Sequence, residues 1–293
     1  MTTEDVSLRY RDLDLWPTLE AGQALYEAQL AAVAAVGPAL ADIAAAADAA
    51  ALRLARGGRL VYVGAGTSAR IGVQDGAELP PTFNWPQDRL VFAIAGGEEA
   101  LLRAVENAED SGSEGAQRMI EIQAGVDDVV IGLAASGATP FTVAALRTAQ
   151  ARGALTVGVA NNPACMLLDV CEHAILIDTG AEAIAGSTRL KAGTAQKVVL
   201  NLFSTLVMTR LGHVYQGLMV NMRATNDKLR RRSVQMVVTI TGCTESVAAE
   251  AVAGSGGELK VAALIARGLV VDAARALLAK HGGNLRGAMS EVR

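Results

Sequence analysis

The chain has 293 residues, of which 51% are apolar but only 3% aromatic, and its formal net charge is −4. This charge argues against broad electrostatic binding to nucleic acid. The start, MTTEDVSLRYRD, is polar, and no uninterrupted apolar run reaches the length of a membrane span, so we expect neither a signal peptide nor a membrane anchor.

Cysteine and histidine are sparse. The three cysteines lack the spacing of a metal or redox motif, and none of the three histidines pairs with another His or a Cys at ligand spacing. Unpaired thiols are typical of a reducing compartment, so we expect a cytoplasmic protein without a metal site.

Residues 1–16 predict a polar arm, and residues 17–56 predict Ala-rich helices with a break at Gly37-Pro38. The first fifty residues hold two basic side chains, Arg9 and Arg11, against eight acids. A helical domain that reads DNA needs the reverse balance.

A glycine-rich turn, Gly64-Ala65-Gly66, follows the first apolar run and precedes a helical stretch that ends at Pro80-Pro81. The glycines permit a close backbone approach, and Thr67 and Ser68 offer hydroxyls. Free N–H groups and the dipole at a helix start favour an anion, so the turn favours a phosphate or sugar-phosphate site.

Two other interpretations of this turn stay open. Gly64, Gly66 and Ala69 also fit the dinucleotide fingerprint, which requires an acid at the end of the second strand. The next apolar run, residues 90–95, ends in Gly96-Gly97 without an acid. A purely structural turn is the second alternative.

Five short apolar runs predict a parallel sheet with helices on both faces. They are residues 60–64, 90–95, 129–134, 155–160 and 174–178. The expected fold is α/β, a doubly wound five-stranded sheet in the flavodoxin-like order 2-1-3-4-5. Its first and third strands are neighbours at the switch point, outside which ligands bind.

The stretch VVIGLAASGATPFTV, residues 129–143, repeats the strand, turn and helix pattern of residues 61–73. Ser136, Gly137 and Thr139 belong to its turn, with Thr139 as the expected helix N-cap. Both loops would open onto one crevice and form a single site for an anionic ligand. Two unrelated helix caps are the alternative.

Two later stretches place charges against a helix dipole. Glu109 and Asp110 are expected to close a helix, as functional carboxylates or as a solvated helix end. Ser187 and Thr188 are expected to cap the long helix around residues 198–211, near whose start Lys191 places a cation. An anionic ligand would offset that cation's unfavourable position.

The carboxyl-terminal part is expected to be a different unit. The run KLRRR at residues 228–232 predicts a charged helix face at the surface or at a subunit contact rather than a nucleic-acid contact. Residues 234–293 predict a small helical bundle similar to ubiquitin-associated modules. Its helices are separated by Gly256-Gly257 and Gly282-Gly283, and we expect it to serve packing or oligomerisation.

With these motifs, the sequence closely resembles the N-acetylmuramic acid 6-phosphate etherases, sugar-isomerase-domain enzymes of bacterial cell-wall recycling. The matching stretches are GAGTSARIGVQDGAELPPTF, AIAGGEEALLRAVENAEDS, GLAASGATPF, GSTRLKAGTAQK and LMVNMRATNDKLRRR. Three residues depart from the family pattern: Ala69 stands for the usual Gly, Gly76 for Ser, and Ala138 for Arg. The last departure removes a cation beside the second loop.

The resemblance implies cleavage of a D-lactyl ether by elimination and then hydration. Glu78 and Glu109 occupy the family's catalytic positions, which implies Glu78 as the acid for lactate departure and Glu109 as the base at C2; the residues alone do not assign the roles. The implied substrate and phosphate ligands are Gly66, Thr67, Ser68, Ser136, Gly137, Thr139, Ser187, Thr188 and Lys191. No metal, nucleotide or other cofactor is implied.

Three rival functions share parts of this pattern. A non-catalytic sugar-phosphate sensor, similar to the glucokinase regulatory protein, would not need both glutamates. A sugar-phosphate isomerase would lack the full GSTRLKAGTAQK and ATNDKLRRR stretches. A sugar-phosphate-responsive transcription factor is opposed by the acidic amino-terminal region.

The expected domains are the amino-terminal arm and helices (residues 1–56), a sugar isomerase domain (57–233) and the helical bundle (234–293). We expect a homodimer with sites near the subunit interface, because long Ala-rich helices leave apolar faces exposed. The expected small-molecule partner is a sugar phosphate, with no nucleic acid or membrane.

Overall fold

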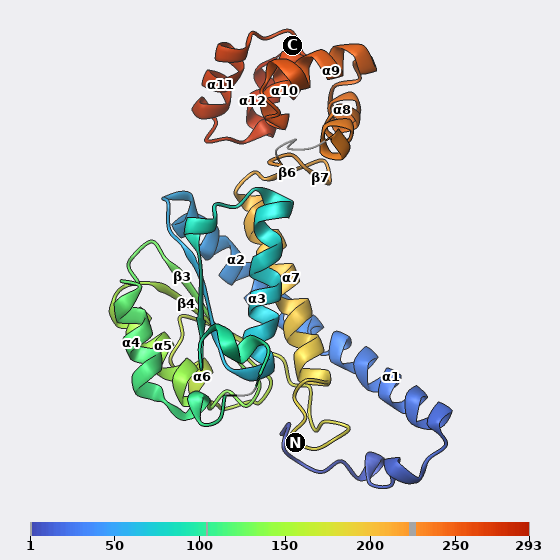
Figure 1. Cartoon of the computed structure of the whole chain (residues 1–293), viewed down its shortest axis with the longest axis vertical. Helices are drawn as coiled ribbons and strands as arrows, with labels where there is room; N and C mark the ends of the chain where they lie inside the picture. Colours follow the sequence, from blue (N-terminus) through green and yellow to red (C-terminus); the bar gives the residue numbers. More distant parts are fainter. Residues whose placement is uncertain (1, 104, 223–226, 293) are drawn as a thin grey trace. The chain divides into compact units, whose positions relative to one another are not determined.

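The computed structural model describes residues 2–103, 105–222 and 227–292 (Figure 1). Contacts within the chain define two compact units. The first comprises Met1–Ala77 and Gln87–Leu206, and the second comprises Glu78–Pro86 and Val207–Arg293. The three domains expected from the sequence stay a prediction.

The first unit is a parallel sheet with helices on both faces (Figure 1). Its strands are β1 (Leu60–Gly64), β2 (Leu90–Ile94), β3 (Val129–Ala134), β4 (Leu155–Ala160) and β5 (His173–Leu176). Its α-helices are α1 (Thr18–Ala34), α2 (Leu40–Ala55), α4 (Gly112–Glu121), α5 (Pro140–Ala151) and α6 (Met166–Asp169). Short 3-10 helices are η1 (Leu8–Tyr10), η2 (Leu13–Leu15), η3 (Gly37–Ala39), η4 (Gln87–Arg89), η5 (Glu98–Leu101) and η6 (Ala108–Asp110). Two long helices, α3 (Gly66–Phe83) and α7 (Lys191–Arg210), have residues in both units.

The strand order is β2-β1-β3-β4-β5 and every pairing is parallel, so the predicted doubly wound sheet is confirmed. Gly64 at the end of β1 is paired with Leu133 of β3. The loops that follow these two strands therefore leave the sheet side by side, as the sequence predicted.

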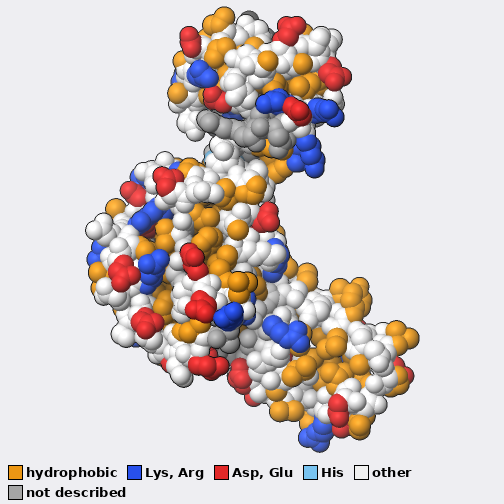
Figure 2. Space-filling view, in the orientation of Figure 1, with side chains coloured by type: hydrophobic (Ala, Val, Ile, Leu, Met, Phe, Trp, Pro, Cys, Tyr) orange, Lys and Arg blue, Asp and Glu red, His pale blue; other side chains and the backbone are white. Residues whose placement is uncertain are grey.

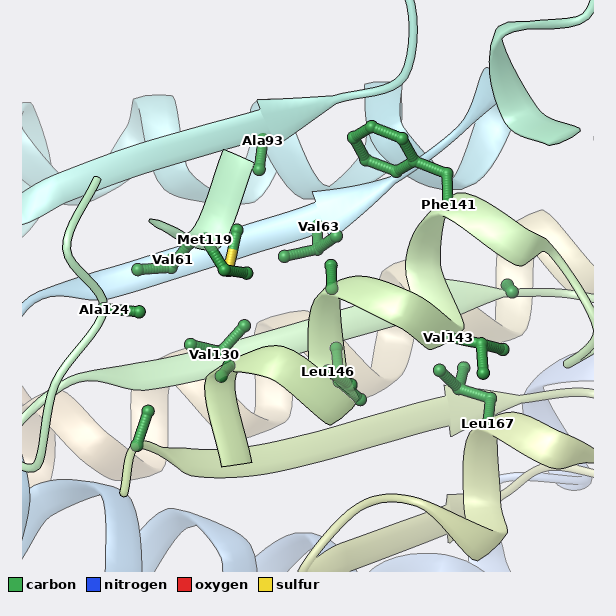
Figure 3. Close-up of a cluster of buried hydrophobic side chains, with 14 of the residues drawn as sticks. Val61, Val63, Ala93, Met119, Ala124, Val130, Phe141, Val143, Leu146 and Leu167 are labelled. Carbon is green, nitrogen blue, oxygen red and sulfur yellow. The ribbon is translucent and has the colours of Figure 1, made fainter. Parts of the chain in front are cut away.

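One apolar core cluster of the first unit lies between the sheet and helices α4 and α5 (Figure 3). Phe141, Ala145, Leu146 and Ala149 recur at helical spacing on α5, which gives this helix one apolar face. Leu146 packs in the same cluster as Val130 of β3. Burial of each large apolar side chain contributes about 1.5–3 kcal/mol, which fixes α5 and the loop before it on the sheet.

A buried carboxylate ties α3 and α7 to the sheet. Asp75 of α3 accepts hydrogen bonds from the Tyr62 hydroxyl (2.7 Å), the Asn201 amide (2.9 Å) and the Ser204 hydroxyl (3.2 Å). Burial raises the pKa of Asp75, and these three hydrogen bonds oppose that rise. The network fixes the direction in which α3 leaves its glycine turn.

Three predicted helix boundaries are wrong. Glu109 and Asp110 do not close a longer helix: they lie in the short η6 (Ala108–Asp110), which is separate from η5 (Glu98–Leu101) and is preceded by Asn107 at a φ of 61°. Helix α3 continues through Pro80-Pro81 to Phe83 and ends where Asn84 adopts a φ of 53°. Helix α7 begins at Lys191, before the apolar run.

Within the described residues, the helical stretch Thr18–Ala55 has the length and hydropathy of a membrane span. The bent helix pair Asp227–Thr241 and Glu245–Gly254 also meets these criteria, but only if its two helices are counted as one span. Core helices also pass this test. In α2, Ile43, Ala50 and Leu54 are buried, and this helix contacts β3, β4 and β5.

The described residues of the second unit form a hairpin and five helices in addition to the ends of α3 and α7. They are β6 (Val214–Tyr215), β7 (Leu218–Met219), α8 (Asp227–Thr241), α9 (Glu245–Gly254), α10 (Leu259–Ile265), α11 (Val271–Lys280) and α12 (Leu285–Glu291). The helices surround an apolar cluster that includes Val237, Leu259 and Leu285. The predicted glycine pairs Gly256-Gly257 and Gly282-Gly283 all adopt positive φ and separate successive helices, as expected.

Candidate functional site

A cavity of about 400 Å³ in the first unit opens at the carboxyl ends of β1 and β3. Its walls come from the two predicted loops, the loop before α7, η6 and the amino-terminal arm. The lining residues are Glu4, Ala65, Gly66, Thr67, Ser68, Glu109, Asp110, Ala134, Ala135, Ser136, Ala138, Thr139, Pro140, Gly186 and Thr188. The predicted crevice between the two loops therefore exists.

The first wall is the glycine turn between β1 and α3. A Cβ atom on Gly64 would lie 3.1 Å from both the Ala69 nitrogen and the Leu133 oxygen, so the tight passage between strand and helix favours glycine. Gly66 adopts a φ of 53° and begins α3, which places Thr67 and Ser68 in the first turn. The N–H groups of a first helical turn have no partner within the helix, so they suit an anion.

The second wall is the turn between β3 and α5. Gly137 adopts a φ of 69°, and a Cβ atom there would lie 2.1 Å from Cys165 Sγ. Ser136 Oγ accepts a hydrogen bond from the Ala138 N–H (3.2 Å). Thr139 occupies the predicted N-cap position, but its side chain makes no capping hydrogen bond. This wall offers a second helix start and two hydroxyls.

The third wall is the loop that precedes α7, and here one prediction is wrong. The start of α7 is capped by Glu182, whose carboxylate accepts hydrogen bonds from the Lys191 and Ala192 N–H groups, each 2.9 Å long. The Ser187 and Thr188 side chains therefore do not provide this cap, although the Thr188 carbonyl accepts from the Gly193 N–H (2.8 Å). The cap comes from a buried acid nine residues upstream, beyond the adjacent positions at which N-caps are expected.

The Lys191 side chain is hydrogen-bonded to a residue outside the cavity lining. Its ammonium donates to the Thr179 carbonyl (2.5 Å), and its pKa is lowered by burial, an effect that Glu182 and Asp178 oppose. Lys191, Ser187 and Gly137 are absent from the cavity wall, although all three lie in the loops that form it. Thr188 from the same segment does line the cavity.

The two predicted catalytic glutamates occupy different places. Glu109, in η6, lines the cavity and is followed by Asp110, which lines it as well. Glu78 is exposed in α3, ten residues after Ser68, and belongs to the second unit. At a rise of about 1.5 Å per residue, these ten residues span about 15 Å of helix.

Glu4 and Asp110 also line the cavity; Glu4 was not predicted at all, and Asp110 was given only as either a functional carboxylate or part of a solvated helix end. Asp110 had a signal, since it adjoins Glu109 in the sequence. Glu4 had none, because a polar arm shows no periodicity. Within the described ranges, no group of three or more His, Cys, Asp or Glu side chains is placed to hold a metal ion.

A larger cavity of about 830 Å³ lies beside the edge strand β2 and is lined by apolar residues such as Val73, Phe92 and Phe141, with Arg118 and three glutamates. None of the predicted site residues lines it. The hydroxyl-bearing loops make the smaller cavity the better candidate for a sugar phosphate.

Comparison with known sequences identifies relatives of this chain. Residues 42–150 match the glucokinase regulatory protein N-terminal SIS domain, and residues 107–206 match the SIS domain. An N-acetylmuramic acid 6-phosphate etherase of Deinococcus radiodurans is 48% identical over 290 residues, covering 99% of this chain and 95% of the relative. One of Streptomyces coelicolor is 45% identical over 294 residues, covering 99% and 94%.

Solved structures show the same fold. A phosphoheptose isomerase from Francisella tularensis superposes with a TM-score of 0.52 at 16% identity, over 66% of this chain and all of that one. A protein of Bacteroides fragilis assigned as a phosphosugar isomerase involved in capsule formation gives 0.54 at 20% identity, over 69% and 95%. The similarity to these solved structures shows the fold, and the identity to the curated relatives over nearly the full length shows the family. The chain belongs to the N-acetylmuramic acid 6-phosphate etherase family.

Proposed function

We propose that this protein cleaves the D-lactyl ether of N-acetylmuramic acid 6-phosphate with water, giving N-acetylglucosamine 6-phosphate and D-lactate. It is then a carbon–oxygen lyase of peptidoglycan recycling and amino-sugar catabolism, acting in the cytoplasm. The observation that carries this proposal is the 48% identity to an etherase over almost the whole of both chains. The cavity supports it, because two hydroxyl-bearing loops and Glu109 line the same space.

The chemistry requires two acid–base steps. In the ring-opened sugar the C1 aldehyde acidifies the C2 proton, which a base removes. Lactate then leaves from C3 as its ether oxygen takes a proton from an acid, and water adds at C3 of the unsaturated aldehyde. Each positioned acid or base contributes about 10²–10⁴-fold in rate.

Glu109 is proposed as the C2 base and Glu78 as the acid that protonates the departing lactate and later activates water. The support for Glu109 is its place in the cavity wall. The support for Glu78 is its position in the family motif GAELPPTF and its exposure to solvent in α3.

The phosphate is proposed to bind the starts of α3 and α5 through backbone N–H groups and the hydroxyls of Thr67, Ser68, Ser136, Thr139 and Thr188. Gly66 permits the turn, and Gly137, Ser187 and Lys191 support the loops from outside the lining. The reaction as written requires no metal or nucleotide.

A homodimer with sites near the subunit interface belongs to the same proposal. Exposed apolar side chains gather on the arm and α1 (Figure 2), among them Leu8, Leu15, Leu19, Tyr26 and Leu30. A second copy would bury them, and closed two-fold dimers are the commonest assembly. In this dimer, Glu78 of one copy completes the cavity that contains Glu109 of the other.

Mixed dimers test that arrangement. Glu78→Ala and Glu109→Ala are each expected to be inactive alone. After unfolding and refolding together, half of the dimers contain one intact site, so about a quarter of the wild-type activity should return. No recovery in a verified mixed dimer would place both glutamates in the same copy.

The reaction itself is tested in heavy water. The wild type should release D-lactate from N-acetylmuramic acid 6-phosphate and incorporate deuterium at C2. Glu78→Ala should still exchange C2 without lactate release, whereas Glu109→Ala should do neither; the reverse pattern would exchange the roles. If the protein binds the sugar phosphate but shows neither C2 exchange nor lactate release, the result would favour a non-catalytic sensor. The presence of both glutamates disfavours that alternative.

A further inference from the structure

The amino-terminal arm reaches the candidate site and is fixed there by buried hydrogen bonds. Thr3 is fully buried; its N–H donates to Asn162 Oδ1 (3.0 Å), and its hydroxyl accepts from Asn162 Nδ2 (3.2 Å). The Thr3 carbonyl accepts from the Gly186 N–H (3.0 Å). The arm therefore joins the carboxyl end of β4 to the loop before α7.

This anchoring places the next side chain, Glu4, in the cavity wall. Its Oε2 stands over Gly186, so close that a Cβ atom on Gly186 would lie 2.8 Å from it. Gly186 is also at a φ of 74°, a conformation that glycine adopts without strain. The anchored arm holds Glu4 at the site, and the absence of a side chain on Gly186 leaves room for its carboxylate.

We propose that Glu4 is a substrate-contacting residue that accepts a hydrogen bond from a neutral group of the sugar, a hydroxyl or the acetamido N–H. This inference rests on the proposed function. An ionised carboxylate only accepts hydrogen bonds, and it repels both the phosphate and the lactyl carboxylate. Glu4 therefore faces the uncharged part of the substrate and selects for its orientation, while the two helix starts hold the phosphate.

The test compares two ligands in calorimetric titrations of the full chain, N-acetylglucosamine 6-phosphate and inorganic phosphate. Glu4→Gln keeps the size of the side chain and removes its charge. We expect it to weaken sugar-phosphate binding about tenfold or more, because the charged acceptor becomes a neutral one, and to leave phosphate binding unchanged or tighter, because the repulsion from Glu4 is removed. Glu4→Ala should behave likewise. Asp5→Asn is the matched control, because the Asp5 carboxylate accepts from the Thr2 N–H within the arm and is not in the cavity lining.

Equal binding of the sugar phosphate by wild type and Glu4→Gln would overturn the proposal. So would an equal loss for both ligands, since that pattern indicates a displaced loop. Lactate release by the wild type tests the reaction separately, so the contact to Glu4 can fail while the etherase activity stands. A wild type that binds no sugar phosphate would overturn both.

Discussion

Glu182 and Lys191 are joined by a hydrogen bond of 2.9 Å, in which Glu182 Oε2 accepts from the backbone N–H at the first residue of α7. Oε1 of the same carboxylate accepts from the next N–H, that of Ala192 (2.9 Å). The anion at this helix start is thus part of the protein, and the proposed phosphate site lies instead at the starts of α3 and α5. The loop between Glu182 and Lys191 is held closed at its base.

Glu182→Gln is therefore expected to destabilise the protein by about 2–3 kcal/mol. The side chain is fully buried, and the new amide would direct an N–H group at a backbone donor and leave it without an acceptor. Thermal unfolding followed by circular dichroism measures the change. Asp178→Asn is the control, because that exposed carboxylate accepts a local bond from the Gly180 N–H (3.1 Å) and should change stability by less than about 0.5 kcal/mol. Equal stability of the two variants would contradict the capping role.

Ala138→Arg is expected to lower the KM for the sugar phosphate about fivefold. Ala138 lines the cavity beside the second loop, where a guanidinium gains about 1 kcal/mol from a nearby phosphate in partly solvated surroundings. The gain should shrink as salt is raised, because exposed charges are screened. Ala138→Gln adds a long side chain without the charge and should show no gain. An unchanged KM at low salt would place the phosphate away from this loop.

Glu109 and Asp110 are neighbours in the cavity wall, and substitution separates their roles. Glu109→Gln should reduce C2 exchange by at least about 100-fold, because it removes the proposed base. Asp110→Asn should reduce it less than about tenfold. NMR measurement of C2 proton exchange in heavy water gives the exchange rate of each variant. A larger loss of C2 exchange in Asp110→Asn than in Glu109→Gln would identify Asp110 as the base.

The sheet and its two loops were predictable because their signals are local. Short apolar runs ending in Gly64 or Ala134, followed by small residues and hydroxyls, specify a parallel strand, a turn and a helix start within fifteen residues. The contributions of Glu4 and Glu182 were not predictable in this way, because Glu182 caps a helix that begins nine residues later and a long-range contact positions the arm that carries Glu4. Thr3 meets Asn162 across 159 positions of sequence, and no periodic pattern records such a contact.

Lys260 makes the second unit sensitive to alkaline pH. Its ammonium donates to the Gly283 carbonyl (2.8 Å), and burial lowers its pKa to about 8 from 10.5. Between these values the unfolded chain binds more protons than the folded one, so the free energy of unfolding should rise as pH increases from 7 toward 10. We expect a rise on the order of 1 kcal/mol, smaller than full burial would give because the side chain is partly exposed.

Tryptophan fluorescence can follow this unit in the full chain. Trp85, which belongs to the second unit, is buried and packs near His213 with ring centroids 6.2 Å apart, and Trp16→Phe removes the signal from the first unit. In that background Lys260→Met should abolish the rise in stability between pH 7 and pH 10. Lys280→Met should retain it, because Lys280 is an exposed partner of Glu291. A rise of the same size in Lys260→Met would assign the pH dependence to another group.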